Sequence, residues 1–282
     1  MIARGRELQL MRMFPRGRAV AVTALFAVLL LVGARGDAQS PRYRAPRTAD
    51  GKPDLNGIWQ AVNTANWDIQ THPARRGAVV ALGAAFSVPG GLSVVEGDEI
   101  PYQPWALKQK QENQEHWLER DPEIKCFMPG VPRATYMPYP FQIVQTPTNI
   151  VMAYEFASAS RMVYMNSTDK SPADMWMGWS RGHWEGDTLV VDVTSLNDQT
   201  WFDRAGNFHS DALHVVERYT RIGADALQYE ATIEDPKVFT RPWKMSMPLY
   251  RRLDKNAQLL EYKCVELVEE LMYGHLRKGR TQ

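Results

Sequence analysis

The region from Leu213 to Glu234 contains two runs with the composition of β-strands. The second run alternates strictly, with apolar Leu227, Tyr229, Ala231 and Ile233 between polar Gln228, Glu230, Thr232 and Glu234. Successive side chains of a strand point to opposite faces, so a period of two predicts a strand with one buried face. The turn residues Gly223-Ala224-Asp225 lie between the runs and predict an antiparallel pair.

Similar segments occupy most of the chain after residue 140. They are 141–145, 150–156, 161–166, 188–194, 243–249 and 259–265. Together with a first strand entered at Leu55–Gln60, we expect about eight strands joined mostly by short turns. Consecutive strands connected in this way favour an all-β, mainly antiparallel and closed or nearly closed barrel over a sandwich.

Two segments predict helices outside this barrel. Trp105 to Arg120 follows a proline, is rich in Gln, Glu and Lys, and stops before Asp121-Pro122. Glu266 to Leu276 is a short amphipathic tail that would cap the structure. The first of these helices lies in an insertion at about 61–140, whose residues 67–101 are punctuated by Gly and Pro and predict a loop or lid.

The N-terminus predicts a secretory signal peptide over residues 1–38. Arginines precede the apolar run Ala19–Val32, and small residues follow it as far as Ala38, the expected cleavage site. The apolar run is short for a membrane span of about 20 residues, which favours cleavage over an uncleaved anchor. Translation could begin at any of three methionines: Met1, Met11 or Met13.

Processing would change the charge of the protein. Residues 1–38 contain six Arg against one Glu and one Asp, so their removal takes the formal charge from +1 to +1 − 4 = −3. A mildly acidic chain without a Lys/Arg cluster is a poor candidate for nucleic-acid binding. No later stretch is apolar enough to insert stably in a membrane. We therefore expect a periplasmic or secreted protein with an extended arm (39–54) and a single barrel domain (55–282).

Cys126 and Cys264 are the only cysteines, and both follow the signal peptide. In an oxidising compartment they predict one disulfide, which would tie a central loop to the last strand. The alternative is a pair of buried free thiols. Neither cysteine stands in a Cys-x-x-Cys motif or beside a histidine cluster.

Gly57-Ile58-Trp59 resembles the Gly-x-Trp motif that opens the first strand of lipocalin-type, or calycin, barrels. The Trp plugs one barrel end in that group. Trp-Glu-Gly-Asp-Thr-Leu (184–189) and Glu217-Arg218-Tyr219 are similar to segments of bacterial calycin-like proteins. The resemblance implies a calycin-type barrel. The long insertion after Gln60 departs from the lipocalin pattern, in which the chain continues directly into its meander.

Almost the whole mature chain also resembles a family of secreted bacterial proteins of unknown function. The family motifs are Pro-Asp-Leu-x-Gly-x-Trp, Cys-x-Pro-Gly-x-Pro-Arg, Trp-Glu-Gly-Asp-Thr-Leu-Val-Val-Asp and His-Ser-x-x-Leu-x-x-x-Glu-Arg. They are matched here by residues 53–59, 126–133, 184–192 and 209–218, with two residues instead of one after Cys126. This resemblance implies secretion and brings no established activity.

The strand at Leu213–Ile222 carries ionisable side chains on both faces. One face holds His214, Val216, Arg218 and Thr220, and the other holds Leu213, Val215, Glu217, Tyr219 and Arg221. A buried charge costs several kcal/mol unless it is paired or hydrated. Two interpretations stay open for Glu217: a buried pair with an arginine that stabilises the barrel, or a contact to a polar ligand.

His209, Asp211, His214 and Glu217 are candidates for acid–base catalysis, because a His oriented by a carboxylate is the usual proton-transfer pair near neutral pH. The alternative is that His209-Ser210-Asp211 is a turn whose side chains bond the loop backbone. No cofactor is indicated and a metal site is disfavoured, since His209 and His214 would face opposite sides of a strand. Gly178-Trp179-Ser180-Arg181-Gly182 matches a serine-hydrolase elbow, but turn and strand follow it instead of a helix.

Aromatic residues are frequent in the same region: Trp176, Trp179, Trp184, Trp201, Phe202 and Phe208. They could stack on a planar or sugar-like ligand, or form a small core beneath the connections. Arg133 could bind a carboxylate or phosphate, or cover a Trp at a barrel end.

These observations predict a secreted or periplasmic protein that binds a small molecule in an aromatic, partly polar barrel cavity. The ligand-binding candidates are Trp179, Trp184, Trp201, Phe208, Arg218 and Arg133. One alternative is a cofactor-free lyase, isomerase or hydrolase that uses the His and Asp/Glu candidates as acid and base. A second alternative is a structural envelope protein that acts through its surface.

Overall fold

A computed structural model of the protein describes residues 43–277. The predicted signal peptide, the candidate start sites and the first part of the arm lie outside the described residues. Contacts divide the chain into residues 1–43 and 44–282, and the second unit contains every element named below. Across residues 43–277, no helix combines the length and apolar character needed to cross a membrane.

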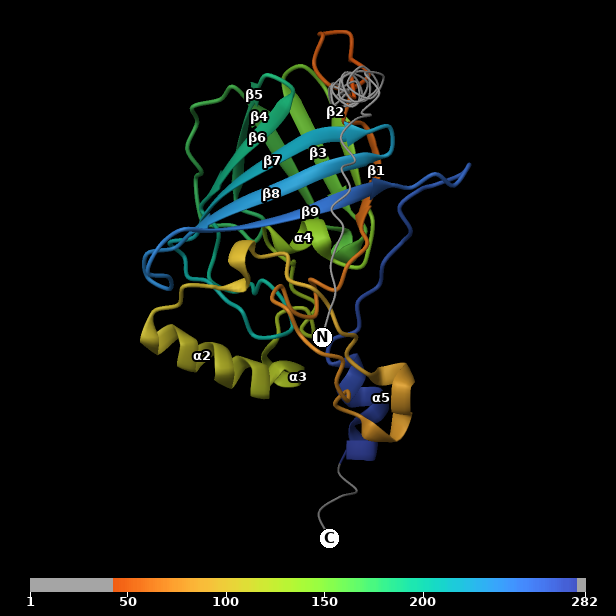
Figure 1. Cartoon of the computed structure of the whole chain (residues 1–282), viewed down its shortest axis with the longest axis vertical. Coiled ribbons are helices and arrows are strands. Elements are labelled where there is room, and N and C mark those ends of the chain that lie inside the picture. The colour runs from red at the N-terminus through yellow and green to blue at the C-terminus, as the bar shows by residue number, and fades with distance from the viewer. Residues whose placement is uncertain (1–42, 278–282) are drawn as a thin grey trace, which may run out of the picture. The chain divides into compact units, whose positions relative to one another are not determined.

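The described residues form a closed barrel of nine strands (Figure 1). The strands are β1 (Gly57–Ala61), β2 (Phe141–Gln145), β3 (Asn149–Tyr154), β4 (Ser160–Met165), β5 (Trp179–Glu185), β6 (Thr188–Thr194), β7 (His214–Gly223), β8 (Ala226–Glu234) and β9 (Trp243–Arg251). Each strand pairs with the next, and β9 pairs with β1 to close the barrel. All pairs are antiparallel except β4 with β5, which are parallel. The predicted all-β barrel is confirmed, with nine strands instead of about eight.

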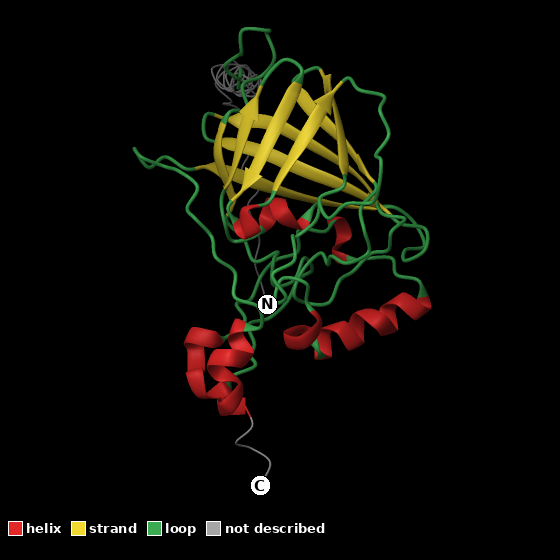
Figure 2. Cartoon of the chain, turned by 180° about the vertical axis from the view of Figure 1, so that it is seen from behind, coloured by secondary structure: helices red, strands yellow, loops and turns green. Residues whose placement is uncertain are grey.

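The helices of the described residues lie in the connections between strands and in the C-terminal segment, outside the barrel wall. They are η1 (Val80–Phe86), η2 (Glu96–Asp98), α2 (Pro104–Glu115), α3 (Trp117–Arg120), α4 (Arg133–Tyr136), η3 (Phe156–Ser158) and α5 (Val268–Arg277). In both views α4 lies against one end of the barrel, and α2, α3 and α5 lie beyond it (Figures 1 and 2). All four residues of α4 are buried, so this short helix covers the barrel end. The two predicted helices are confirmed as α2–α3 and α5.

The alternation along β7 and β8 decides which side chains fill the barrel. Leu227, Tyr229, Ala231 and Ile233 are all fully buried. Glu217 and Tyr219 of β7 face the interior in the same way, whereas His214 is only partly buried. The predicted division of the two faces therefore holds, and two charged residues of β7, Glu217 and Arg221, lie on its buried inner face.

Turn and strand were predicted after Gly182, but the first half of β5 was not predicted, because its inward positions Ser180 and Gly182 are poor strand formers. Gly182 pairs with Met165 in the parallel ladder. A Cβ atom at this position would lie 2.7 Å from Met165 Sδ and from Val163 Cγ1. The glycine therefore allows β5 to approach β4 closely, and the feature that hides the strand in the sequence also permits its pairing.

The predicted strand at residues 259–265 is wrong, because this segment has no strand structure. β9 is paired by β8 on one side and by β1 on the other, so it offers no free edge at that point. The predicted disulfide between Cys126 and Cys264 is confirmed, with the Cα atoms 5.7 Å apart. It joins the segment after α3 to the coil before α5, and not to a last strand.

Trp59 is fully buried in β1, and its Nε1 donates a hydrogen bond to the carbonyl of Leu55 at 2.9 Å. The guanidinium of Arg251 lies 4.3 Å from the centre of its ring, and that of Arg221 lies 5.6 Å away. These two arginines make the cation–π contacts on this tryptophan. Arg133, for which such a contact was one of the two expectations, is held elsewhere.

Candidate functional site

An ion pair crosses the barrel interior. Arg161 Nη1 on β4 lies 2.7 Å from Glu217 Oε2 on β7, and both side chains are almost fully buried. β5 and β6 separate these strands in the barrel order, so the pair spans the interior and does not follow the wall. Burial opposes the charge on Arg161, but the adjacent Glu217 carboxylate keeps the pKa of Arg161 well above its usual value.

Three tyrosines of the interior surround this pair. Tyr219 and Tyr229 each donate a hydrogen bond to Glu217 Oε1, at 2.9 and 2.8 Å. Arg161 in turn donates to the hydroxyl oxygens of Tyr154 and Tyr219, at 3.0 and 3.1 Å. Burial raises the pKa of all three tyrosines, so their hydroxyls stay protonated at neutral pH. The result is a preorganised polar network inside an otherwise apolar barrel.

The barrel wall has a gap next to this network. The β4–β5 ladder consists of only three residue pairs, from Val163–Ser180 to Met165–Gly182. The residues before Val163 in β4 and before Ser180 in β5 do not pair with each other. A pocket of about 420 Å³ lies between these unpaired parts of the two strands. Arg161 and Ser180 line the pocket, and Arg161 also donates a hydrogen bond to Ser180 Oγ at 3.3 Å. The pocket therefore adjoins the interior network.

Sulfur and aromatic side chains form much of the pocket wall. The thioethers are those of Met128, Met162, Met175 and Met177, and the aromatic rings are those of Tyr164, Trp176 and Trp179. The rings of Trp179 and Tyr164 stack with centroids 4.6 Å apart. Trp176 packs on Phe127 at 4.8 Å, next to the disulfide-bonded Cys126. Thioethers are flexible and polarizable, so such a wall adapts to the shape of an apolar ligand.

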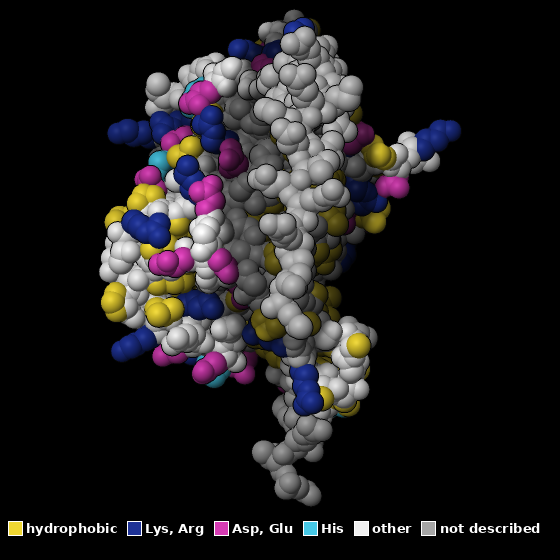
Figure 3. Space-filling model, in the orientation of Figure 1, with side chains coloured by type: hydrophobic (Ala, Val, Ile, Leu, Met, Phe, Trp, Pro, Cys, Tyr) yellow, Lys and Arg dark blue, Asp and Glu magenta, His cyan; other side chains and the backbone are white. Residues whose placement is uncertain are grey.

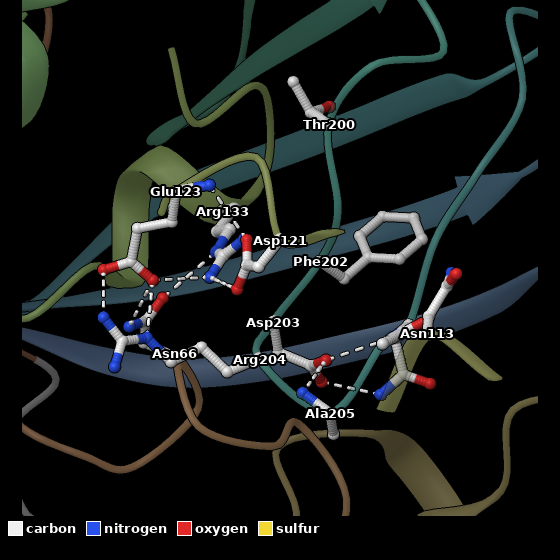
Figure 4. Close-up of polar contacts among 12 residues, drawn as sticks. Asn66, Asn113, Asp121, Glu123, Arg133, Thr200, Phe202, Asp203, Arg204 and Ala205 are labelled. Atoms are coloured by element: carbon white, nitrogen blue, oxygen red, sulfur yellow. Dashed lines mark hydrogen bonds and ion pairs between the residues drawn. The ribbon is translucent and has the colours of Figure 1, made fainter. Parts of the chain in front are cut away.

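A second buried ionic network lies in the connections outside the barrel (Figure 4). Arg133 of α4 donates to both carboxylate oxygens of Asp121, at 2.8 and 3.1 Å, and to Glu123 at 2.8 Å. Glu123 also accepts two hydrogen bonds from Arg204. Burial opposes ionisation of Glu123, but Arg204 and Arg133 lower its pKa to about 2. The third nitrogen of Arg133, Nε, donates to the side-chain oxygen of Asn66 at 3.1 Å, so all three guanidinium nitrogens are held by protein groups and Arg133 ties the loops together.

Asp203 belongs to the same region. Its carboxylate accepts hydrogen bonds from the backbone amides of Ile69, Ala205 and Asn207 and from the side-chain amide of Asn207. Burial, together with nearby Asp68, raises the pKa of Asp203 to about 7. All of these partners are protein groups, so this residue stabilises the loop at 203–207.

The four catalytic candidates are not brought together. His209 is buried in the connection between β6 and β7, where Nδ1 donates to the Ser210 carbonyl at 2.9 Å and Nε2 accepts from the Thr200 hydroxyl at 2.6 Å. Burial lowers its pKa. Asp211 is exposed and pairs with Lys237. Glu217 lies inside the barrel, so none of these three side chains is positioned to exchange a proton with another.

His214 lies on the outer face of β7. Its Nε2 is 2.8 Å from Asp192 of β6, and its Nδ1 is 3.3 Å from Glu234 of β8. Partial burial disfavours the charged form, but the two carboxylates outweigh it and raise the pKa of His214. His214 and Glu217 thus point to opposite sides of the barrel wall. Among the described residues, no group of three or more His, Cys, Asp and Glu is arranged to hold a metal ion.

One of the six predicted ligand-binding residues, Trp179, lines the pocket at the β4–β5 gap. Trp184 packs partly buried against the core at the other end of β5. Trp201 and Phe208 form a bridge with each other, and Phe208 stacks on Tyr102. Arg218 pairs with Glu185 on the outer face. The predicted aromatic set is therefore divided: Trp201, Phe202 and Phe208 pack beneath the connections, whereas Trp176 and Trp179 line the pocket.

Sequence reasoning missed Arg161 and the four methionines. Arg161 lies two residues before Val163 and four before Met165 in β4. The period of two therefore places Arg161 on the same, inner face of the strand. Met175 and Met177 flank Trp176 just before β5, but only the three-dimensional structure brings Met128 and Met162 to them.

The chain matches no protein-family model, and no curated protein matches it.

Proposed function

We propose that the protein binds a small molecule in the pocket at the β4–β5 gap, and that it does so outside the cytoplasm. The observation that carries this proposal is the short ladder between β4 and β5, which leaves a gap in the barrel wall beside Arg161 and Ser180. A ligand in this gap would contact thioethers and aromatic rings and would lie against a fixed polar network.

The size and chemistry of the pocket support this proposal. Ligand pockets typically measure roughly 300–1,000 Å³ and combine apolar walls with a few polar groups. This one measures about 420 Å³, and its polar groups include Arg161, Ser160 and Ser180 beside the sulfur and aromatic wall. Because Arg161 and Ser180 are held by the interior network, they are already ordered before a ligand binds.

The disulfide supports the proposed compartment. Disulfides persist in the periplasm and outside cells, whereas cytosolic thiols are kept reduced. The bond between Cys126 and Cys264 lies beside Phe127, which packs on Trp176 of the pocket wall. The resemblance of the motifs to a secreted bacterial family agrees with this location. An oxidising compartment would therefore also keep one side of the pocket in place.

The surface offers less support for a structural envelope role. On the face seen in Figure 3, the Lys/Arg and Asp/Glu side chains are interspersed over the barrel wall. Where side chains are coloured on this face, positive and negative groups are mixed, which does not favour a partner of one charge. The pocket is the more specific feature of the molecule.

Native mass spectrometry of the processed protein purified from the periplasm tests the proposal, combined with an NMR screen of small molecules read at the Trp176 and Trp179 indole N–H signals. We expect a non-covalent mass excess or library compounds that shift these two signals. The variant Met162→Arg should block the pocket and abolish either effect. Met272→Arg is the matched control, since Met272 is 54% exposed on α5 and Met162 is 38% exposed at the pocket.

Two results would overturn the proposal. One is a bound molecule or signal shift that survives in Met162→Arg, because the ligand would then lie elsewhere. The other is a bare protein whose two indole signals respond to no compound in a chemically diverse library.

A further inference from the structure

The charges of the pocket wall are not balanced. Two charged residues line it, Arg161 and Asp174. Arg161 is buried and neutralised by Glu217 at 2.7 Å. Asp174 is exposed, and among residues 43–277 it forms neither an ion pair nor a hydrogen bond. A molecule that enters the pocket therefore meets one uncompensated negative charge.

The neutral part of the wall has the same electrostatic preference. The faces of Trp and Tyr rings carry negative potential and attract cations, Trp most strongly. Trp176, Trp179 and Tyr164 supply such rings. Thioether sulfur atoms contribute lone pairs and are polarizable. A carboxylate, aromatic rings and thioethers together favour a positively charged occupant over a neutral or anionic one.

The volume of the pocket distinguishes a metal ion from an organic cation as its occupant. A soft metal ion would suit the thioethers, but metal–ligand distances are roughly 2.0–2.6 Å, so an ion needs a small cluster of converging atoms. The pocket measures about 420 Å³, which is the volume of a pocket for an organic molecule. The size of the pocket and its charge thus agree on an organic ion.

We infer that the ligand of the β4–β5 pocket is an organic cation, with a quaternary or aromatic ammonium group held between the Trp rings and Asp174. This inference rests on the proposed function and adds the class of the ligand. The ammonium group would lie at the rim near Asp174, and the apolar body would contact the methionines.

A matched pair of probes isolates the charge. Choline carries a trimethylammonium group, and 3,3-dimethylbutan-1-ol has the same shape with carbon in place of the charged nitrogen. Benzyltrimethylammonium adds an aromatic body, phenylacetate carries the opposite charge, and silver(I) reports a soft-metal site. Each is titrated into the processed protein at low ionic strength while the indole N–H signals of Trp176 and Trp179 are followed by NMR.

We expect choline to bind at least about threefold more tightly than its neutral analogue, and benzyltrimethylammonium to bind more tightly than choline. Asp174→Asn should weaken both cations about threefold to tenfold and leave the neutral probe unchanged, and added salt should reduce this difference. Asp169→Asn is the control, because Asp169 is exposed in the same loop and its side chain does not line the pocket.

The other outcomes distinguish an error in the ligand class from a failure of the proposed binding function. If the neutral probe or phenylacetate binds as well as the cations, the pocket binds small molecules but the inference about charge is wrong. If silver(I) alone perturbs the two signals, the thioethers take a soft metal and the inference is wrong. If no probe and no library compound perturbs them, both the inference and the proposed function fall.

Discussion

Arg161 and Glu217 meet at 2.7 Å across the barrel, from strands that have two others between them. The pair is closed on the inside by Tyr219 and Tyr229, and it adjoins the β4–β5 pocket on the Arg161 side. One ion pair therefore links opposite parts of the barrel wall and orders the polar groups beside the proposed binding site.

Removing one partner of this pair should destabilise the protein strongly. Arg161→Met leaves the Glu217 carboxylate buried without its counter-ion, and breaking a buried pair in this way costs about 3–5 kcal/mol. Urea unfolding, followed by tryptophan fluorescence, measures the loss of unfolding free energy.

The double variant Arg161→Met, Glu217→Leu should recover most of that loss, because no buried charge is left unpaired. Tyr229→Phe, which removes one hydrogen bond, should cost only about 1 kcal/mol. A double variant no more stable than Arg161→Met would show that the residues do not act as a pair.

The barrel could be predicted from the sequence because the alternation of apolar and polar residues in a strand is a local pattern. The alternation of Leu227, Tyr229, Ala231 and Ile233 reports directly which face is buried. The signal failed where tertiary contacts decide the outcome. Gly182 looks like a strand breaker, yet it is required for the close approach to Met165. The apolar residues at 259–265 resemble a strand, but the closed barrel offers them no edge.

The candidate site was harder to predict from the sequence, because it is formed by residues that are far apart in the chain. The charge pattern of β7 shows that Glu217 needs a partner, but it does not say which arginine supplies one. His209, Asp211 and His214 are close in sequence and were grouped for that reason. The burial of His209, the exposure of Asp211 and the outward direction of His214 separate them. The pocket depends on where the β4–β5 ladder ends, which no local pattern encodes.

His214 should make the stability of the barrel depend on pH. Asp192 and Glu234 raise its pKa in the folded state above the unfolded value of 6.5. Its contribution is therefore fully present below pH 6.5 and is lost as the pH rises through the folded-state pKa. Because His214 is partly exposed, the effect is no more than about 1 kcal/mol.

Thermal unfolding of the wild type and of His214→Gln between pH 5.5 and 8.5 measures this contribution. The wild type should exceed the variant by more at pH 5.5 than at pH 8.5. The difference between the two proteins cancels the opposite effect of His209, whose pKa is lowered by burial. A constant difference across the range would rule out the predicted ionisation.

Loss of the disulfide should affect both stability and binding. Cys126 and Cys264 are 138 residues apart, and removing a native disulfide typically costs about 2–5 kcal/mol. Phe127 would then be free to leave Trp176, so the pocket wall should also loosen. The double variant Cys126→Ser, Cys264→Ser should unfold at a lower temperature and bind benzyltrimethylammonium more weakly. Unchanged binding in the folded variant would show that Trp176 is held without the bond.

Methionine oxidation should report whether the pocket is occupied. Met128 and Met162 are 39% and 38% exposed at its rim, whereas Met177 is 5% exposed deeper in the wall. Hydrogen peroxide converts accessible methionine to its sulfoxide, which peptide mass spectrometry quantifies at each position. In the free protein Met128 and Met162 should oxidise well before Met177.

Saturating benzyltrimethylammonium should slow the oxidation of the two rim methionines. It should leave the oxidation rate of Met272 on α5 unchanged, because Met272 lies outside the pocket. Equal protection of Met272 would mean that the probe scavenges peroxide or binds the surface generally. Oxidation before the titration should weaken the binding of benzyltrimethylammonium, since a polar sulfoxide replaces an apolar contact of the pocket wall.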